Sequence, residues 1–408
     1  MSSDLVGFIG ISLVSIITII IAIKWPGISK IIFVALIVRI ILLLLGHYVF
    51  VLPDSTADAK SFEGAAWDIA QNGFFNLSDY YKGPDSRFIS WLIAIFYSLF
   101  GRSVLMAKSM TLFFGVGSVF LGWKIANKLW DTTIANKVGW FIALFPSLIL
   151  YSVLVMREAY ICFFLLVAIY GIANWSKTQN FKSIIIALMG FAAASFFHGA
   201  SAIGAFTFII YVAVVSTKET LISLKTYKIK LFHLSMLVLF IIFIAFYLSG
   251  KIYIPYIKDF EFISDPYTFL RKTRVSVMGV AAYPEWLIPR TSFELIYKVP
   301  IRGIYFLFSP FPWDVKEVRH IIGLFDAFIY IYLFILILRN FKTIWQDPAL
   351  RIILLIVGSY VLAFAVGVGN FGTGIRHRSK FAAMLILLAA PLLNKLVFTK
   401  KSFKEKNF

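Results

Sequence analysis

Long apolar runs alternate with short polar gaps along most of the 408-residue chain. Several runs extend for about twenty residues, the length that a helix needs to cross roughly 30 Å of hydrocarbon. We therefore predict an all-α polytopic membrane protein with about eleven transmembrane helices, forming a single integral membrane domain over residues 1–408. The predicted spans are 5–24, 31–51, 103–123, 138–155, 159–175, 183–197, 198–216, 231–249, 317–338, 350–368 and 380–397.

Lys and Arg gather in some of the polar gaps and not in others. The basic gaps are near residues 24–30, 124–137, 177–182, 218–230, 339–351 and 395–406. Because short cytoplasmic loops collect positive charge, we place these gaps inside, the N-terminus outside and the C-terminus inside. Arg39, within the second run, is expected to extend its guanidinium toward the same cytoplasmic side. This pattern predicts a location in a membrane, with the basic loops on the cytoplasmic side.

Composition agrees with that location, since 60% of the residues are hydrophobic and only 14% are charged. The formal net charge of +19 does not indicate nucleic-acid binding, because the basic residues punctuate the apolar runs instead of forming one face. The single cysteine, Cys162, excludes a disulfide framework and a Cys/His metal site. Membrane lipids are the partners that this composition predicts.

Four polar segments fall on the predicted outer side of the membrane, and we expect the function there. They are a first outer loop with surface helices at 52–102, a turn at 157–158, a long outer loop at 250–316 and the segment "GNFGTGIRHRSK" at 369–380. The apolar stretch 88–101 is too short to cross and would break the charge alternation, so we predict a surface or half-inserted helix.

The first outer loop is acidic. Its Ser55 to Asp58 spacing resembles a helix-start signal, and Asn72-Gly73 resembles a stop, which together predict a short amphipathic helix between them. Asp54 and Asp58 come at or before the first turn, where the helix dipole favours a carboxylate. We expect Asp58 to be functional, whereas Glu63 and Asp68 are interpreted as capping or solvated acids.

Two further outer segments carry charges. Arg157 and Glu158 interrupt a long apolar stretch and predict a hairpin; they bring a second carboxylate outside or simply end two helices. In 369–380, three glycines precede Arg376, His377 and Arg378, and a flexible backbone with guanidinium groups suits binding of a phosphate. His198, at another outer hairpin, is either a member of this site or a packing residue.

A resemblance to a known family follows from these residues. The acidic loop, then "RFISWLIAIFYSLFGRSVLMAKSMTLFFG" and "ALFPSLILYSVLVMREA", resemble the bacterial polyprenyl-linked membrane glycosyltransferases of the GT-C superfamily, such as the protein mannosyltransferase-like and aminoarabinose-transferase-like proteins. The resemblance covers residues 40–200. It implies that an acidic residue of the first outer loop, Asp58 or Asp54, acts on the acceptor and that Glu158 is a further acidic residue of the site. The family's adjacent Asp-Glu pair is absent, and an extra helix precedes the family's first.

The chemistry of glycosyl transfer needs a base for the acceptor hydroxyl and positive groups for the departing phosphate. The resemblance implies a polyprenyl-phosphate-linked sugar donor and a lipid- or glycan-linked acceptor, used in cell-surface polysaccharide or glycolipid biosynthesis. It also implies a location in the bacterial cytoplasmic (inner) membrane. Arg376, His377, Arg378 and Arg157 are the expected phosphate ligands, and His198 the expected substrate-lining residue. No cofactor is certain, and a divalent metal ion at Glu158 stays open.

Two alternatives remain. "RHR" at 376–378 also resembles, more loosely, proteins of the O-antigen-polymerase type, which join lipid-diphosphate-linked repeats. A lipid-linked oligosaccharide transporter or flippase belongs to another class and predicts inverted repeats, broken helices and charges near the bilayer midplane. Convergence of Asp58, Glu158 and Arg376 in one outer cavity favours a transferase, and a charged path through the bundle favours transport.

Overall fold

The computed structural model describes residues 3–226, 231–248 and 279–393. Within these ranges the chain is helical, and the only β-type pairing is an isolated bridge between Ala282 and Asn370. The basic C-terminal residues 395–406 and much of the predicted long outer loop, residues 250–278, lie outside the described residues. The all-α prediction is thus confirmed for the described part of the chain.

The helices follow one another with short connections. In the first half of the chain they are α1 (Ser3–Lys24), α2 (Ser29–Tyr48), α3 (Asp58–Ala70), α4 (Phe88–Phe100), α5 (Val104–Leu129), α6 (Thr132–Leu144), α7 (Pro146–Tyr151), α8 (Glu158–Thr178) and α9 (Phe181–Phe197). In the second half they are α10 (Ala202–Lys225), α11 (Leu231–Leu248), α14 (Ser292–Phe308), α15 (Val318–Arg339), α16 (Phe341–Gln346), α17 (Pro348–Gly367), α18 (Phe371–Ser379) and α19 (Ala382–Ala389).

Among the described residues, seven helical segments are long and apolar enough to cross a membrane. They contain α1, α2, α5, α8, α10, α15 and α17. Three shorter apolar helices lie at Phe88–Phe100, Phe181–Phe197 and Ala382–Leu392. The chain therefore has the helices of a polytopic membrane protein, and the larger count of about eleven spans stays a prediction.

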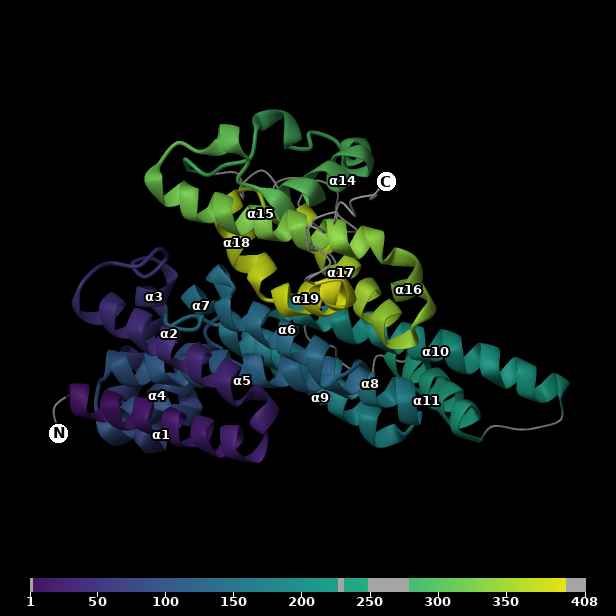
Figure 1. Ribbon diagram of the computed structural model, residues 1–408, viewed down its shortest axis with the longest axis horizontal. Helices are drawn as coiled ribbons and strands as arrows, with labels where there is room; N and C mark the ends of the chain where they lie inside the picture. Colours follow the sequence, from purple (N-terminus) through teal and green to yellow (C-terminus); the bar gives the residue numbers. More distant parts are fainter. Residues whose placement is uncertain (1–2, 227–230, 249–278, 394–408) are drawn as a thin grey trace, which may run out of the picture.

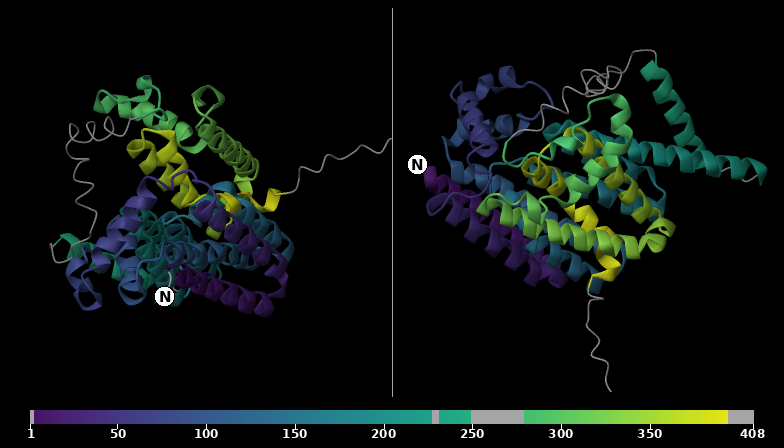
Figure 2. Two further views of the ribbon diagram at one scale, coloured as in Figure 1. Left: turned by 90° about the vertical axis from the view of Figure 1, so that its left-hand side faces the viewer. Right: turned by 90° about the horizontal axis from the view of Figure 1, so that it is seen from above.

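Most of the long helices run along one direction of the molecule (Figure 1). The segments α3, α7 and α18 lie toward the end where the N-terminus is found, and α10 extends to the opposite end. Figure 2 shows the α3 to α4 region at the same end as the N-terminus. Since α1 begins at the predicted outer side, this end of the molecule corresponds to the predicted outer face.

Helices α8 and α9 pack especially closely because small residues face each other. A Cβ atom at Gly190 would lie 2.4 Å from the backbone nitrogen of Ala168, and one at Gly171 would lie 2.5 Å from that of Ala187. Glycine at these positions lets two backbones approach directly, as is typical of helix pairs in membranes. The pairing fixes the position of α8, whose first residue is Glu158.

The predicted span 138–155 is not one helix. Helix α6 ends at Leu144, and α7 begins at Pro146, whose ring nitrogen has no hydrogen to donate to the preceding turn. Arg39 of α2 binds the end of α6, donating from Nη1 to the carbonyl oxygen of Ala143 at 2.8 Å. Its side chain is therefore buried, with the residue 1% exposed, and the expectation that it extends toward the cytoplasm was wrong.

Arg302 binds the C-terminal end of α17, as Arg39 binds that of α6. It lies within the predicted long outer loop at 250–316, but it is fully buried. It donates to the carbonyl oxygens of Ala365 at 2.7 Å and Val368 at 2.8 Å, which close the end of α17. The last carbonyls of a helix lack partners within the helix and carry partial negative charge, so a buried guanidinium stabilises them.

The first outer loop contains the predicted amphipathic helix, α3, which is followed by Gly73 at a φ of 84°. Ser55 does not cap it, because its hydroxyl donates to the carbonyl oxygen of Leu52. Glu63 is not a solvated acid either: it is buried and accepts hydrogen bonds from Arg102 at 2.7 Å and from Tyr97 at 2.9 Å. This network joins α3 to α4 and to the start of α5.

Candidate functional site

Two carboxylates from distant parts of the chain stand at the first residues of their helices. Asp58 begins α3 and Glu158 begins α8. The N-terminus of a helix carries a partial positive charge that favours an ionised carboxylate, so the two helices position two negative charges by the same means. Helix α18 supplies the opposite charge through Arg376.

Arg376 joins the two carboxylates. Its Nη1 forms an ion pair with Asp58, and its Nε lies 3.2 Å from Oε1 of Glu158. The side chains differ in access to solvent, since that of Asp58 is 45% exposed, that of Arg376 17% and that of Glu158 1%. Arg376 thus brings the two carboxylates together, and Asp58 is the most accessible of the three side chains.

Lys380, which follows α18, is a second cation beside Glu158. Its Nζ lies 3.8 Å from Oε1 of Glu158, and both side chains are almost fully buried. Burial lowers the pKa of Lys380 well below 10.5, although Glu158 acts to raise it. For Arg376, burial acts to lower the pKa, but Glu158 and Asp58 outweigh it and the pKa is raised. Arg376 therefore stays charged at neutral pH.

Two histidines, His377 and His198, lie next to Lys380 and to each other. Nδ1 of His377 is 2.6 Å from Nζ of Lys380, and the rings of His377 and His198 have centroids 5.2 Å apart. Burial, and after it the charge of Lys380, lowers the pKa of both histidines well below 6.5. They are neutral at physiological pH, so His377 can offer a phosphate a neutral N–H group and no charge.

Tyr151, which sequence analysis missed, holds Asp54 near the same group of residues. Oη of Tyr151, at the end of α7, donates to Oδ2 of Asp54 at 2.8 Å. The side chain of Tyr151 is buried, so this hydrogen bond holds Asp54 against the end of α7. Asp54 has a φ of 61°, an uncommon backbone conformation for a residue other than glycine. No motif in the sequence distinguishes Tyr151 from the chain's other tyrosines.

Arg157 borders the group on the side of α9. Its Nη1 donates to the carbonyl oxygen of Phe197 at 3.4 Å, and its guanidinium lies over the ring of Phe62 at 5.6 Å. The buried Nε has no hydrogen-bond partner. Burial lowers the pKa of Arg157, while Glu158 and Asp58 raise it, which places this guanidinium within electrostatic reach of both carboxylates.

Arg378 is not brought to this group. The glycine-containing segment is not a flexible loop but helix α18, which Asn370 caps by accepting a hydrogen bond from the backbone nitrogen of Thr373 at 2.8 Å. Residues two positions apart on a helix point in different directions, so Arg378 turns away from Arg376. It donates instead to the carbonyl oxygen of Leu307 at 2.9 Å and pairs with Asp326 at 3.2 Å.

Among the described residues, no group of three or more His, Cys, Asp or Glu side chains is arranged to hold a metal ion. The cluster combines two carboxylates with cations, and the cations occupy the positions beside Glu158. Its chemistry is that of charge-assisted hydrogen bonds, suited to binding an anion and to accepting a proton at an exposed carboxylate.

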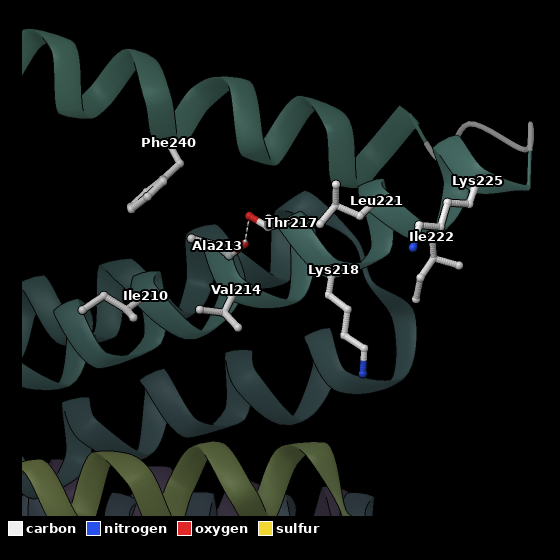
Figure 3. Close-up of a pocket in the computed structure, with 9 residues that line it drawn as sticks. All are labelled: Ile210, Ala213, Val214, Thr217, Lys218, Leu221, Ile222, Lys225 and Phe240. Carbon is white, nitrogen blue, oxygen red and sulfur yellow. Dashed lines mark hydrogen bonds between the residues drawn. The ribbon is translucent and has the colours of Figure 1, made fainter.

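A cavity that is lined by residues of α10 and α11 lies away from this cluster. It measures about 530 Å³, and Figure 3 shows side chains from both helices along it. The lining is mostly apolar, with Lys218 and Lys225 near the C-terminal end of α10. It offers no carboxylate for catalysis. A second cavity, of about 160 Å³, lies among α3, α4 and the residues between them.

No family model, no curated protein and no solved structure matches this chain.

Proposed function

We propose that this protein is a membrane glycosyltransferase that moves a sugar from a polyprenyl-phosphate-linked donor to a lipid- or glycan-linked acceptor at the outer face of the membrane. One observation carries the proposal: Arg376 contacts the accessible carboxylate of Asp58 and the buried carboxylate of Glu158 at the predicted outer ends of α3 and α8. Base and phosphate-binding cation are thereby adjacent, as glycosyl transfer requires.

The reaction assigned to the cluster is a single displacement at the sugar. The acceptor hydroxyl gives its proton to Asp58 while its oxygen forms a bond to C1 of the sugar. The bond between C1 and the phosphate oxygen breaks, and its electron pair leaves with the polyprenyl phosphate. Arg376 stabilises the negative charge that develops on that phosphate, and Arg157 adds a second guanidinium.

Glu158 has a positioning role in this scheme. It is buried and pairs with both Arg376 and Lys380, so it fixes the cation that faces Asp58. Neither of its carboxylate oxygens makes a hydrogen bond with the protein, so its contacts with these cations are ion pairs. Asp58 is the base because it is the member of the pair that an acceptor can reach.

Polymerisation of lipid-diphosphate-linked repeats would use the same groups with a larger acceptor. Transport is the alternative from another class, and the breaks between α6 and α7 and after α14 are features that transporters share. At both breaks, however, an arginine closes the carbonyl end: Arg39 binds α6 and Arg378 binds α14. These charges are bound to backbone and thus support a packing role over a substrate path.

The test gives purified protein in lipid discs a polyprenyl-phosphate-linked labelled hexose or aminopentose together with bacterial envelope lipid and glycan acceptors. Asp58→Asn should slow transfer on the order of 10²–10⁴-fold, since it removes a base, and should still bind the donor. Asp79→Asn, an exposed acid of the same loop, is the matched control. Unimpaired transfer by Asp58→Asn, or movement of intact donor across vesicles without transfer, would contradict the proposal.

A further inference from the structure

An aromatic cavity next to the charged cluster is not used by the chemistry described above. It measures about 160 Å³ and is lined by three groups of residues. Helix α3 gives Ala65, Asp68 and Ile69; the segment after it gives Tyr80, Tyr81, Lys82, Gly83, Asp85 and Arg87; and α4 gives Phe88 and Trp91. Its volume is close to that of one sugar ring.

The aromatic rings of the cavity form a connected wall. The centroids of Tyr81 and Trp91 are 5.0 Å apart, and those of Phe88 and Trp91 are 5.9 Å apart in a stacked arrangement. The indole N–H of Trp91 donates to the carbonyl oxygen of Leu77 at 2.8 Å, which fixes the ring. Tyr81 remains 41% exposed, so part of its ring is free to contact a ligand.

Carboxylates stand around this wall. Asp68 is exposed at the end of α3, and Asp85 is half-buried beside the start of α4. Oδ1 of Asp85 accepts the backbone N–H of Arg87 at 2.7 Å, which holds the side chain in place. A sugar ring has C–H groups on its faces and hydroxyl groups around its rim. An aromatic wall bordered by carboxylate acceptors complements both features.

Packed side chains connect the cavity to Arg157 of the charged cluster. The ring of Phe88 packs on that of Phe197 at 5.1 Å, and the carbonyl oxygen of Phe197 accepts a hydrogen bond from Arg157. Asp85 also acts to raise the pKa of Arg157, so the two side chains lie within electrostatic reach of each other. Phe88, which lines the cavity, is thus linked through Phe197 to Arg157, so the cavity lies on the Arg157 side of the charged cluster.

We infer that the cavity formed by Tyr81, Trp91, Asp68 and Asp85 is a saccharide-binding subsite that holds a glycan acceptor beside the charged cluster. The assignment rests on the proposed function for the direction of transfer, whereas the binding of sugar by the cavity can be tested without any transfer. The ligand class is a neutral or amino-substituted pyranose, whether its far end is free or lipid-linked.

Saturation-transfer NMR on wild-type protein in lipid discs tests binding directly, with maltose, lactose, mannobiose and N,N′-diacetylchitobiose as the probes. We expect at least one of them to bind. Tyr81→Ala should weaken that binding on the order of tenfold, because it removes an aromatic contact face. Asp68→Asn should weaken it several-fold by removing an acceptor.

The matched control is Phe75→Ala, since Phe75 is an aromatic residue of the same loop that is 93% exposed and lies outside the cavity. It should bind sugar as the wild type does. Thermal unfolding of all three variants checks that loss of binding is not loss of folding. Failure of all four saccharides to bind wild-type protein, or equal binding by Tyr81→Ala and wild type, would overturn the subsite.

In the transfer assay, Tyr81→Ala should raise the acceptor KM and leave kcat close to that of the wild type, because the cavity lies outside the charged cluster. Sugar binding that depends on Tyr81 in a protein with no transfer activity would support the subsite and refute the proposed function. Transfer that depends on Asp58 but not on Tyr81 would support the proposed function and refute the subsite.

Discussion

Arg376 and Glu158 lie 3.2 Å apart, Nε to Oε1, although one belongs to a helix near the C-terminus and the other begins α8. Lys380 lies on the same carboxylate oxygen at 3.8 Å. One buried negative charge thus holds two cations, and the position of α18 relative to α8 depends on it. If Glu158 loses its charge, the cations of Arg376 and Lys380 lose the buried negative charge that they pair with.

Glu158→Gln should therefore lower the free energy of unfolding by about 3–5 kcal/mol, the range for breaking a buried ion pair from one side. Lys380 would have to release its proton or stay charged without a nearby carboxylate. Thermal unfolding in lipid discs measures the loss. Asp79→Asn, at an exposed acid, should change stability by less than about 0.5 kcal/mol. Equal stability of the two variants would show that the buried carboxylate does not hold α18.

Arg378 and Asp326 form a second buried ion pair, at 3.2 Å between Nη2 and Oδ2. In a double-mutant cycle, Arg378→Met and Asp326→Asn should each destabilise, and the double variant should lose about 1–3 kcal/mol less than their sum. Glu63 and Arg102 provide the comparison, because the side chain of Arg102 is 46% exposed. Their coupling should be about 1 kcal/mol or less. Similar coupling in both cycles would contradict the effect of burial.

Helix positions along this chain were largely predictable from local pattern. The spacing between Ser55 and Gly73 predicts a helix, and α3 occupies Asp58–Ala70. Apolar length also identified the short helix α4, and its place at the membrane surface stays a prediction. These features depend on residues within a few turns of one another, which a sequence displays directly.

Contacts across the chain were harder to predict, and the direction of individual side chains was hardest. Arg376 and Arg378 look equivalent in sequence, but a helix turns them to different partners, Glu158 and Asp326. Arg39 resembled a residue that extends toward the cytoplasm, because nothing in its own segment reveals the open end of α6 beside it. Such long-range partners are set by packing and not by local propensity.

Acid should destabilise the folded protein through two half-buried histidines, His198 and His377. Their pKa values in the folded state lie below the ordinary 6.5. At a pH between the folded-state pKa and 6.5, the unfolded chain therefore binds more protons than the folded protein. The stabilisation is complete above pH 6.5 and is lost as the pH falls below it, by about 1.4 kcal/mol per pH unit for each histidine. Thermal unfolding of wild type between pH 7.5 and 5 measures this slope.

The variant with His198→Asn and His377→Asn should show a shallower decline over the same interval, because asparagine does not titrate. Its stability at pH 7.5 sets the reference, so any packing loss is separated from the pH dependence. Parallel curves for the variant and the wild type would contradict the assignment of the slope to these residues.

The contact between α8 and α9 predicts a strong effect from a single methyl group. In Gly190→Ala the new Cβ would lie 2.4 Å from the backbone nitrogen of Ala168 and 2.8 Å from the backbone oxygen of Phe164. Backbone atoms cannot rotate away, so the helices must separate, at a cost of about 1–3 kcal/mol in unfolding free energy. Because α8 begins with Glu158, this separation should also weaken transfer in the glycosyltransferase assay.

Gly358→Ala is the matched control, since a Cβ there meets nothing within 4 Å in a helix of similar length. Alanine favours the helical backbone over glycine by roughly 0.5–1 kcal/mol, so this variant should be as stable as wild type or more stable. Opposite signs for the two substitutions would locate the effect in the contact of α8 with α9 and not in helix propensity. Equal effects would mean that the two backbones are not in direct contact at Gly190.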